Sequence, residues 1–195
     1  MAIDLDAPPL TDHRRRLLDA MSEVVARKGY AEVTIADLAA EARVSRRTFY
    51  EHFASKAECL IALYDVASDQ ALGVLRDAID PQRDWHLQVE QAIEAYLSCL
   101  ACSPALLRTL FIAILGLGPQ GLAARRRANL RLADFILEVV NRPPRGKPLE
   151  AAFAMGIVGA INELILEAIE HGAVDRLPQL TPIAAQLARA VIDGA

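Results

Sequence analysis

Apolar residues recur at helical spacing along most of the chain, and this feature constrains the fold more than any other. Across residues 12–28 they fall at i, i+3, i+4 and i+7 positions: Leu17, Leu18, Met21, Val24 and Val25. Gly29 follows and supplies the left-handed residue that commonly ends a helix. Ala and Leu are frequent, runs of β-branched residues are scarce, and aromatic residues make up only 5% of the chain. We therefore expect an all-α protein.

Start and stop signals divide the chain into about nine helices. Thr34 can cap a short helix over residues 34–42, and Ser45 can cap another over residues 46–53. Ser55 and Glu58 form a capping box that begins a helix running to about Ile79. Further patterns predict helices over residues 85–101, 103 to about 116 or 118, 120–140, 149–171 and 181–192, with a Pro/Gly-bearing loop over residues 141–148.

Composition excludes several classes of protein. The chain has 195 residues, of which 53% are hydrophobic and 24% charged, so it is neither disordered nor collagen-like. Cys59, Cys99 and Cys102 cannot all pair within one chain, which fits a reducing compartment. The N-terminus lacks an apolar signal segment, and the longest uninterrupted apolar stretches, residues 110–118 and 151–161, are shorter than a membrane span. We expect a cytoplasmic protein without a membrane partner.

The net charge of −4 conceals a basic segment near the N-terminus. Residues 10–56 carry nine Lys and Arg against seven Asp and Glu, whereas residues 57–195 carry twelve against sixteen. Within residues 43–56, four cations accompany one acid, Glu51. These cations are Arg43, Arg46, Arg47 and Lys56. An anionic partner is expected to bind there.

The same segment has the organisation of a helix-turn-helix. A supporting helix is followed by two short helices joined by a short turn, an arrangement that places one exposed helix in the DNA major groove. Arg46 and Arg47 begin the second short helix, where guanidinium groups can bind guanine edges or pair with phosphates, and Tyr50 lies one turn after Arg46. Hydroxyl, imidazole and ammonium groups at helix ends can hold the phosphate backbone: Thr34, His52 and Lys56. A plain helical hairpin with a solvated basic face is the alternative.

These residues resemble the TetR/AcrR family of bacterial one-component transcriptional regulators. The resemblance covers about residues 13–62 and is carried by Thr34-Ile35-x-Asp37-Leu38-Ala39-x-x-Ala42, Val44-Ser45-Arg46-x-Thr48-Phe49-Tyr50-x-His52-Phe53 and Ser55-Lys56-x-Glu58-x-Leu60. It implies that the helix from Arg46 through Tyr50 enters the major groove and that positions 34, 50 and 56 hold phosphate. The predicted DNA-binding residues are Thr34, Arg43, Ser45, Arg46, Arg47, Thr48, Tyr50, His52 and Lys56.

Two residues depart from the family pattern. Arg43 stands in the turn where the family usually has Gly, so we expect either a positive φ at Arg43 or a remodelled turn. Arg47 stands where relatives often have a small residue, and an additional base or phosphate contact is expected there. The operator of a relative is therefore not transferred to this chain.

Two C-terminal segments resemble the helices that form a four-helix dimer interface in this family. Small residues recur every four positions in residues 149–171, and the last helix adds apolar ones. The predicted interface comprises Ala152, Gly156, Ala160, Ile183, Leu187 and Val191. Packing within one chain is the alternative. A homodimer is also expected because one short recognition helix covers only a few base pairs.

The central helices lie where family members hold an inducing ligand. They carry many apolar side chains, which favour an apolar or aromatic effector over a sugar or nucleotide. The predicted ligand-binding residues are His86, Tyr96, Leu107, Phe111, Phe135 and Asn162, with ordinary core packing as the alternative for each.

We therefore predict a ligand-responsive transcriptional regulator, most simply a repressor released from an inverted-repeat operator. A DNA-binding domain over residues 10–56 would precede a ligand-binding and dimerisation domain over residues 57–195. The alternative is a ligand-independent architectural or protein-interaction protein with the same DNA-binding head. Cys99 and Cys102 form a C-x-x-C pair without a second pair, so zinc binding or redox sensing is the alternative to ordinary packing of these thiols. No catalytic motif points to an enzyme, and no cofactor or metal is expected.

Overall fold

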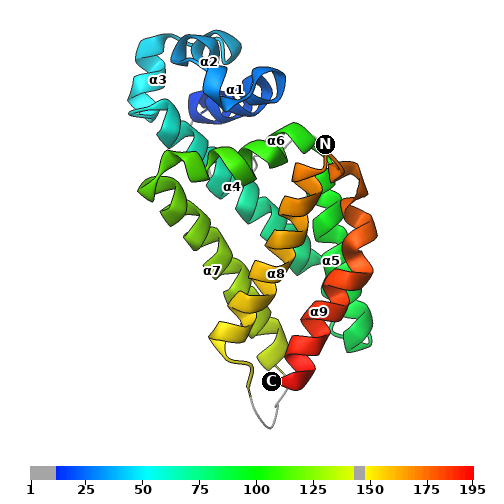
Figure 1. The fold of residues 1–195 in the computed structure, drawn as a ribbon. Helices are drawn as coiled ribbons and strands as arrows, with labels where there is room; N and C mark the ends of the chain where they lie inside the picture. Colours follow the sequence, from blue (N-terminus) through cyan, green and yellow to red (C-terminus); the bar gives the residue numbers. More distant parts are fainter. Residues whose placement is uncertain (1–11, 143–147) are drawn as a thin grey trace. The chain divides into compact units, whose positions relative to one another are not determined.

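The computed structural model describes residues 12–142 and 148–195 (Figure 1). Across these residues the chain forms nine α-helices, with short π- and 3₁₀-helical segments and no strand. The all-α prediction is therefore confirmed. The loop predicted over residues 141–148 falls mostly outside the described residues.

The helices follow the sequence pattern with small differences at their ends. In the first part of the chain they are α1 (Asp12–Lys28), α2 (Ile35–Glu41), α3 (Arg46–His52) and α4 (Lys56–Asp77), with a 3₁₀ turn over Tyr30–Glu32. The others are α5 (Trp85–Ala101), α6 (Pro104–Arg108), α7 (Pro119–Asn141), α8 (Ala151–Glu170) and α9 (Thr181–Gly194). Helix α4 ends at Asp77, two residues before the predicted end.

The chain divides into two compact units. Among the described residues, the first comprises residues 12–70 and 105–125, and the second comprises residues 71–104, 126–142 and 148–195. Helices α4 and α7 therefore contribute residues to both units.

In the first unit, α1 packs against α2 and α3 around a small apolar core. Its fully buried side chains include Leu17, Leu18, Met21, Leu38, Phe49 and Phe53. The rings of Phe49 and Phe53 lie one turn apart and are tilted by 47° to each other, with centroids separated by 5.8 Å. Cys59 is buried as well, and burial raises the pKa of its thiol to about 12. Cys59 is therefore a core residue.

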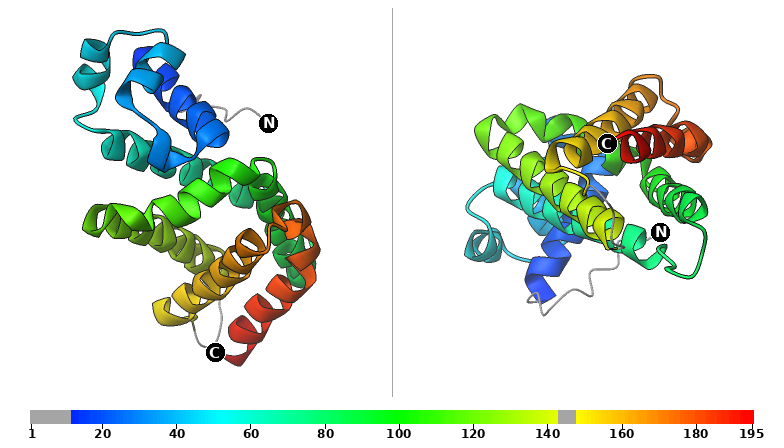
Figure 2. Two further views of the ribbon diagram at one scale, coloured as in Figure 1. Left: turned by 45° about the horizontal axis from the view of Figure 1, so that its top comes forward. Right: turned by 90° about the horizontal axis from the view of Figure 1, so that it is seen from below.

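In the second unit, α5 packs against α9 and against the 3₁₀ segment Val174–Leu180, and α8 packs beside α9 (Figure 2). Helix α8 is apolar and long enough to meet the composition criterion for a membrane span, which core helices of globular proteins also meet. One side of α8 is buried through Ala154, Ile157 and Ile165. Another side remains exposed, including Phe153 at 43%.

The segment before α7 is not the single regular helix that the sequence predicted. After α6, the chain forms a π-helical turn over Thr109–Ala113 and a 3₁₀ turn over Leu115–Leu117. Gly118 then reverses the chain with a φ of 64°. At Gly121 the first turn of α7 approaches the carbonyl oxygen of Ile114 so closely that a Cβ would overlap it. This close approach requires glycine at position 121.

Candidate nucleic-acid interface

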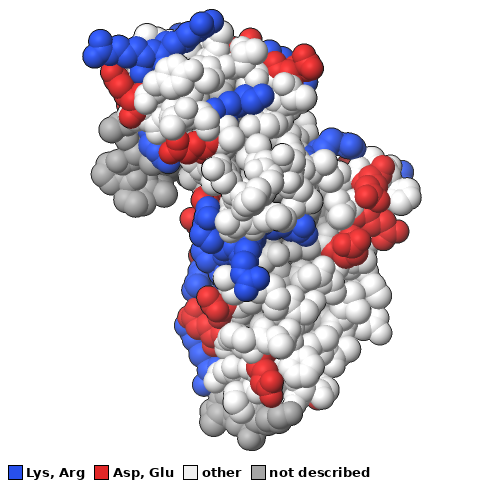
Figure 3. All heavy atoms as spheres, turned by 60° about the vertical axis from the view of Figure 1, so that its left-hand side comes forward, with Lys and Arg blue, Asp and Glu red and all other residues white. Residues whose placement is uncertain are grey.

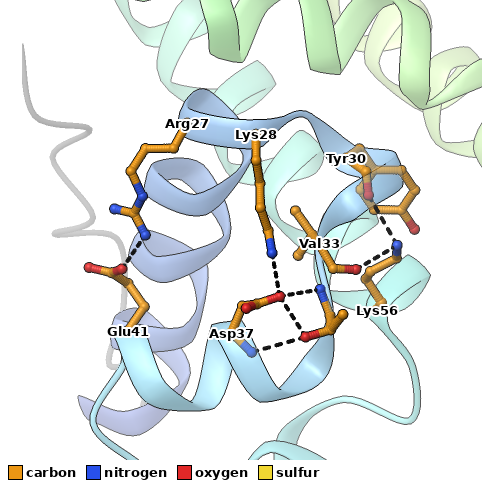
Figure 4. Close-up of polar contacts among 8 residues, drawn as sticks. Arg27, Lys28, Tyr30, Val33, Asp37, Glu41 and Lys56 are labelled. Atoms are coloured by element: carbon orange, nitrogen blue, oxygen red, sulfur yellow. Dashed lines mark hydrogen bonds and ion pairs between the residues drawn. The ribbon is translucent and has the colours of Figure 1, made fainter.

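Helix α2 begins with a complete capping box (Figure 4). The Thr34 hydroxyl accepts a hydrogen bond from the Asp37 amide at 3.2 Å, and the Thr34 amide donates to the Asp37 carboxylate at 2.8 Å. Lys28, in the last turn of α1, donates to the same carboxylate at 2.6 Å. These hydrogen bonds, from Lys28 first and then from Thr34, hold the pKa of Asp37 well below its usual range. The start of α2 is thereby tied to the end of α1.

The turn between α2 and α3 contains the positive φ that the sequence raised as one possibility. Arg43 has a φ of 53°, and it is the one non-glycine residue with positive φ in the described ranges. The Val44 amide donates to the Ala39 carbonyl at 2.9 Å and the Arg43 amide donates to the Ala40 carbonyl at 3.1 Å, which is the Schellman arrangement. Arg16 of α1 donates to the carbonyl of Arg43 at 3.1 Å. The turn is thus stabilised by backbone hydrogen bonds to α2 and by a side-chain hydrogen bond from α1.

Helix α3 buries one face and exposes the other. The Ser45 hydroxyl caps it by accepting a hydrogen bond from the Thr48 amide at 3.0 Å. Phe49 is fully buried, whereas Tyr50 is 57% exposed. The Arg47 side chain is 90% exposed and pairs with Glu51 at 3.2 Å. Figure 3 shows Lys and Arg side chains standing out from the surface of this unit.

Arg46 also lies on the exposed surface of α3, in its first turn. The exposed arginines and the phenol of Tyr50 therefore project from a short helix that its phenylalanine anchors in the core. Such a helix can enter the major groove without rearrangement of the unit.

Lys56 has contacts within the protein that sequence reasoning did not foresee. Its ammonium donates to the carbonyls of Tyr30 at 3.0 Å and Val33 at 2.8 Å, and it lies 4.3 Å from the centre of the Tyr30 ring (Figure 4). Partial burial lowers the pKa of Lys56. Lys56 therefore fixes the 3₁₀ turn that precedes Thr34.

All nine predicted DNA-binding residues lie between the start of α2 and the start of α4, within the first unit. Six are exposed: Thr34, Arg43, Ser45, Arg46, Arg47 and Tyr50. The other three are partly buried: Thr48, His52 and Lys56. Sequence reasoning missed the pairs that join α1 to α2, namely Lys28 with Asp37 and Arg27 with Glu41. The two residues of each pair lie on different helices, so spacing along one helix cannot predict the pair. Only the packing of α1 against α2 brings the two side chains together.

The helices that carry these residues match a known family. Residues 17–63 fit the family described as bacterial regulatory proteins, tetR family. This segment of the chain is therefore similar to the tetR family. The match begins in α1 and ends in α4, and its two end residues, Leu17 and Leu63, are both fully buried. The matched residues therefore include all of α2, the turn and α3.

Known proteins similar to this chain have several functions. The HTH-type transcriptional activator FasR of Mycolicibacterium smegmatis is 27% identical over 134 residues, which are 69% of this chain and 61% of FasR. The chain thus spans less than two thirds of FasR. The nucleoid occlusion factor SlmA of Shewanella halifaxensis is 26% identical over 171 residues, which are 86% of this chain and 84% of SlmA.

A solved structure shares the fold over most of the chain. The transcriptional regulator FadR from Bacillus subtilis, solved in complex with stearoyl-CoA, superimposes with a TM-score of 0.71 at 19% identity. The superposition covers 93% of this chain and 98% of FadR. At this identity the comparison establishes the fold alone.

The second unit of the chain contains an apolar cavity of about 100 Å³. Its lining comes from α4, α5, α7, α8 and α9 and includes three of the predicted ligand-binding residues, Tyr96, Phe135 and Asn162. The other three are not in the lining: His86 is exposed, and Leu107 and Phe111 belong to the first unit. Phe111 lies in the π-helical turn before α7, which the periodicity did not predict, whereas His86 lies in the first turn of α5 and Leu107 lies in α6.

The six predicted interface residues all retain exposure on α8 and α9. Ile183 is 44% exposed and Leu187 is 37% exposed, and Ala152 and Gly156 are exposed as well. The remaining two, Ala160 and Val191, are partly exposed. Two neighbouring helices of the second unit therefore present small and apolar side chains to solvent.

Proposed function

We propose that this chain is a tetR-family, ligand-responsive, sequence-specific DNA-binding transcriptional regulator of the cytoplasm, acting as a repressor. The observation that carries this proposal is helix α3, which is anchored by Phe49 and exposes Arg46, Arg47 and Tyr50. Guanidinium groups on such a helix can form bidentate hydrogen bonds to guanine edges in the major groove. Residues 10–56 would form the DNA-binding domain and residues 57–195 the ligand-binding and dimerisation domain.

Single substitutions on α3 test this assignment. Arg46→Ala or Arg47→Ala should relax the base preference by about 1–3 kcal/mol for each bidentate pair of hydrogen bonds to a base, because discrimination between bases depends on those bonds. Tyr50→Ala should weaken binding about equally on all sequences, because a phosphate contact carries no base information. Competition between duplexes at fixed salt measures both effects. Unaltered affinity and base preference in all three variants would contradict the assignment.

We propose that the chain acts as a homodimer on an inverted repeat. The exposed apolar residues of α8 and α9 support this, because burial against a second copy would remove them from water. One α3 helix covers few base pairs, so two copies are needed for a specific site. A monomer at micromolar concentration by light scattering would contradict this proposal.

We propose that an apolar small molecule in the second unit controls DNA binding. The apolar cavity supports this, and FadR of Bacillus subtilis, which shares the fold, was solved with stearoyl-CoA. Ligand would favour dimers whose two α3 helices no longer match successive major grooves, with α4 transmitting the change because it belongs to both units. By linkage, the ligand must change DNA affinity by the same factor that DNA changes ligand affinity.

The similarity to SlmA bears on a second candidate, a DNA-binding protein whose larger unit serves only as a surface for other proteins. In that case apolar molecules would leave DNA affinity unchanged. The competition assay, repeated with a bound apolar ligand, separates the two candidates.

A further inference from the structure

A second hollow adjoins the apolar cavity and contains two arginines. It measures about 430 Å³ and lies entirely within the second unit. The two hollows share four lining residues: Ile79, Trp85, Val139 and Val140. Arg83 and Arg142 line the second hollow only. An almost wholly apolar space therefore continues into a space that bears two guanidinium groups.

Both guanidinium groups are held in place but keep further donors. Arg83 donates from Nε to Asp80 at 3.1 Å and from Nη1 to Gln91 at 2.9 Å. Arg142 donates from Nη2 to Glu138 at 2.6 Å. A guanidinium has five N–H donors, so these contacts among the described residues use only part of each group. The remaining N–H groups can bind an anion in the hollow.

The ion pairs beside the second hollow leave guanidinium donors for an anion. Glu138 is shared, since it accepts hydrogen bonds from both Arg142 and Arg76. Arg76, Arg83 and Arg142 thus accompany two paired acids, Asp80 and Glu138, and the Asp84 carboxylate caps the start of α5. A carboxylate or phosphate added there would meet guanidinium N–H donors that these acids do not use, and guanidinium binds both groups through charge-assisted hydrogen bonds.

We propose that the second unit binds an amphiphile that has one apolar chain and one anionic head group. The chain occupies the apolar cavity, and the head group binds Arg83 and Arg142. The inference rests on the proposed function because it names the chemical class of the effector. A fatty acid and an acyl-CoA share this chemistry through a carboxylate and through phosphates, respectively, whereas a fatty alcohol of equal length lacks the charge.

The single tryptophan of the chain, Trp85, lines both hollows and reports binding by its fluorescence without DNA. The full chain is titrated with decanoate, 1-decanol and decanoyl-CoA below their micelle concentrations. Decanoate should bind at least tenfold more tightly than decanol. Decanoate should also bind about fourfold more tightly per methylene than octanoate does, because each methylene adds buried apolar surface.

Three substitutions locate the head group. Arg83→Gln and Arg142→Gln should each weaken decanoate binding about tenfold and leave decanol binding unchanged. Arg126→Gln is the matched control, since Arg126 is an exposed arginine of α7 outside both hollows. Whichever of decanoate and decanoyl-CoA shows the larger fall in affinity in the two variants identifies the source of the head group.

The outcomes separate this inference from the proposed function. Equal affinity for decanoate and decanol, no binding of either anion, or an equal fall in affinity in Arg126→Gln and Arg142→Gln would overturn the anionic head group. Control of DNA binding by a neutral apolar ligand would then still be open to test. Arginine-dependent binding that leaves DNA affinity unchanged would support the inference and contradict the proposed control of DNA binding.

Discussion

Arg43 occupies a backbone conformation that glycine adopts more readily. Its φ of 53° places the Cβ against the backbone, at a cost of about 1 kcal/mol. The Schellman hydrogen bonds and the contact from Arg16 maintain this conformation. A cation is thereby kept exposed in the turn just before α3.

Arg43→Gly should therefore raise the free energy of unfolding by about 1 kcal/mol. If Arg43 contacts phosphate, the same change should weaken DNA binding uniformly across sequences and reduce the slope of log K against log salt by about one. Urea denaturation and a salt titration of DNA affinity measure the two effects. A lower free energy of unfolding in the variant would contradict this prediction. It would show that the added backbone entropy of glycine in the unfolded chain outweighs the strain removed from the folded chain.

Asp37 couples the start of α2 to the end of α1 through its ionised carboxylate. Because its folded-state pKa lies below the ordinary 3.8, Asp37 contributes stability that is fully present above pH 3.8 and is lost as the pH falls toward the folded-state pKa. Wild type should therefore be more stable than Asp37→Asn at pH 7, with a difference that shrinks below pH 3.8. Urea denaturation across this range measures it. A difference independent of pH would contradict the ionic contribution of Asp37.

Residue spacing predicted the caps but not the long-range contacts. Thr34 and Ser45 cap their helices as predicted, because a cap depends on residues that are adjacent in sequence. The hydrogen bonds from Lys56 to Tyr30 and Val33 join residues that lie 23 or more positions apart, so only the packed helices bring them together. The resemblance implied a phosphate contact for Lys56, and that role stays a prediction.

At the scale of the elements, Gly121 determines how α7 begins. A Cβ there would overlap the Ile114 carbonyl, which is backbone and cannot move aside cheaply. Gly121→Ala should therefore lower the free energy of unfolding by about 1–3 kcal/mol. Gly116→Ala is the matched control, since a Cβ at Gly116 meets open space, and it should be neutral or slightly stabilising. Equal free energies of unfolding in the two variants would contradict this prediction, because they would show that the backbone around Ile114 shifts to make room for the added Cβ at little cost.

The segment from α6 to the start of α7 also shows where apolar periodicity fails to predict the local backbone structure. Apolar spacing predicted one helix ending near Gly116 or Gly118, whereas the chain changes from α to π to 3₁₀ geometry within a few residues. Three- and four-residue spacings of apolar side chains look alike over so short a run, and tertiary contacts decide between them. The longer helices α5, α7 and α8 were predicted to within two residues because many turns repeat the pattern.

At the scale of the whole molecule, Gly156 tests the proposed dimer. It lies exposed on α8, and a Cβ there meets nothing within 4 Å in the isolated chain. Gly156→Arg should therefore keep the helical content of the wild type but prevent close approach of a second α8, so that light scattering gives a monomer and DNA binding weakens. Glu94→Arg, an equally exposed change on α5, is the control and should remain dimeric. A dimeric Gly156→Arg variant would place the interface elsewhere.

The central claim is that α3 reads base sequence as part of a symmetric dimer. Selection of bound sequences from randomised duplex DNA at about 150 mM salt tests it most directly, because this salt suppresses non-specific phosphate binding. We predict enrichment of an inverted repeat whose half-sites lie about one or more helical turns apart, and a relaxed base preference within each half-site in Arg46→Ala. Recovery of DNA with no common sequence would contradict the claim and favour a protein that binds DNA without reading it.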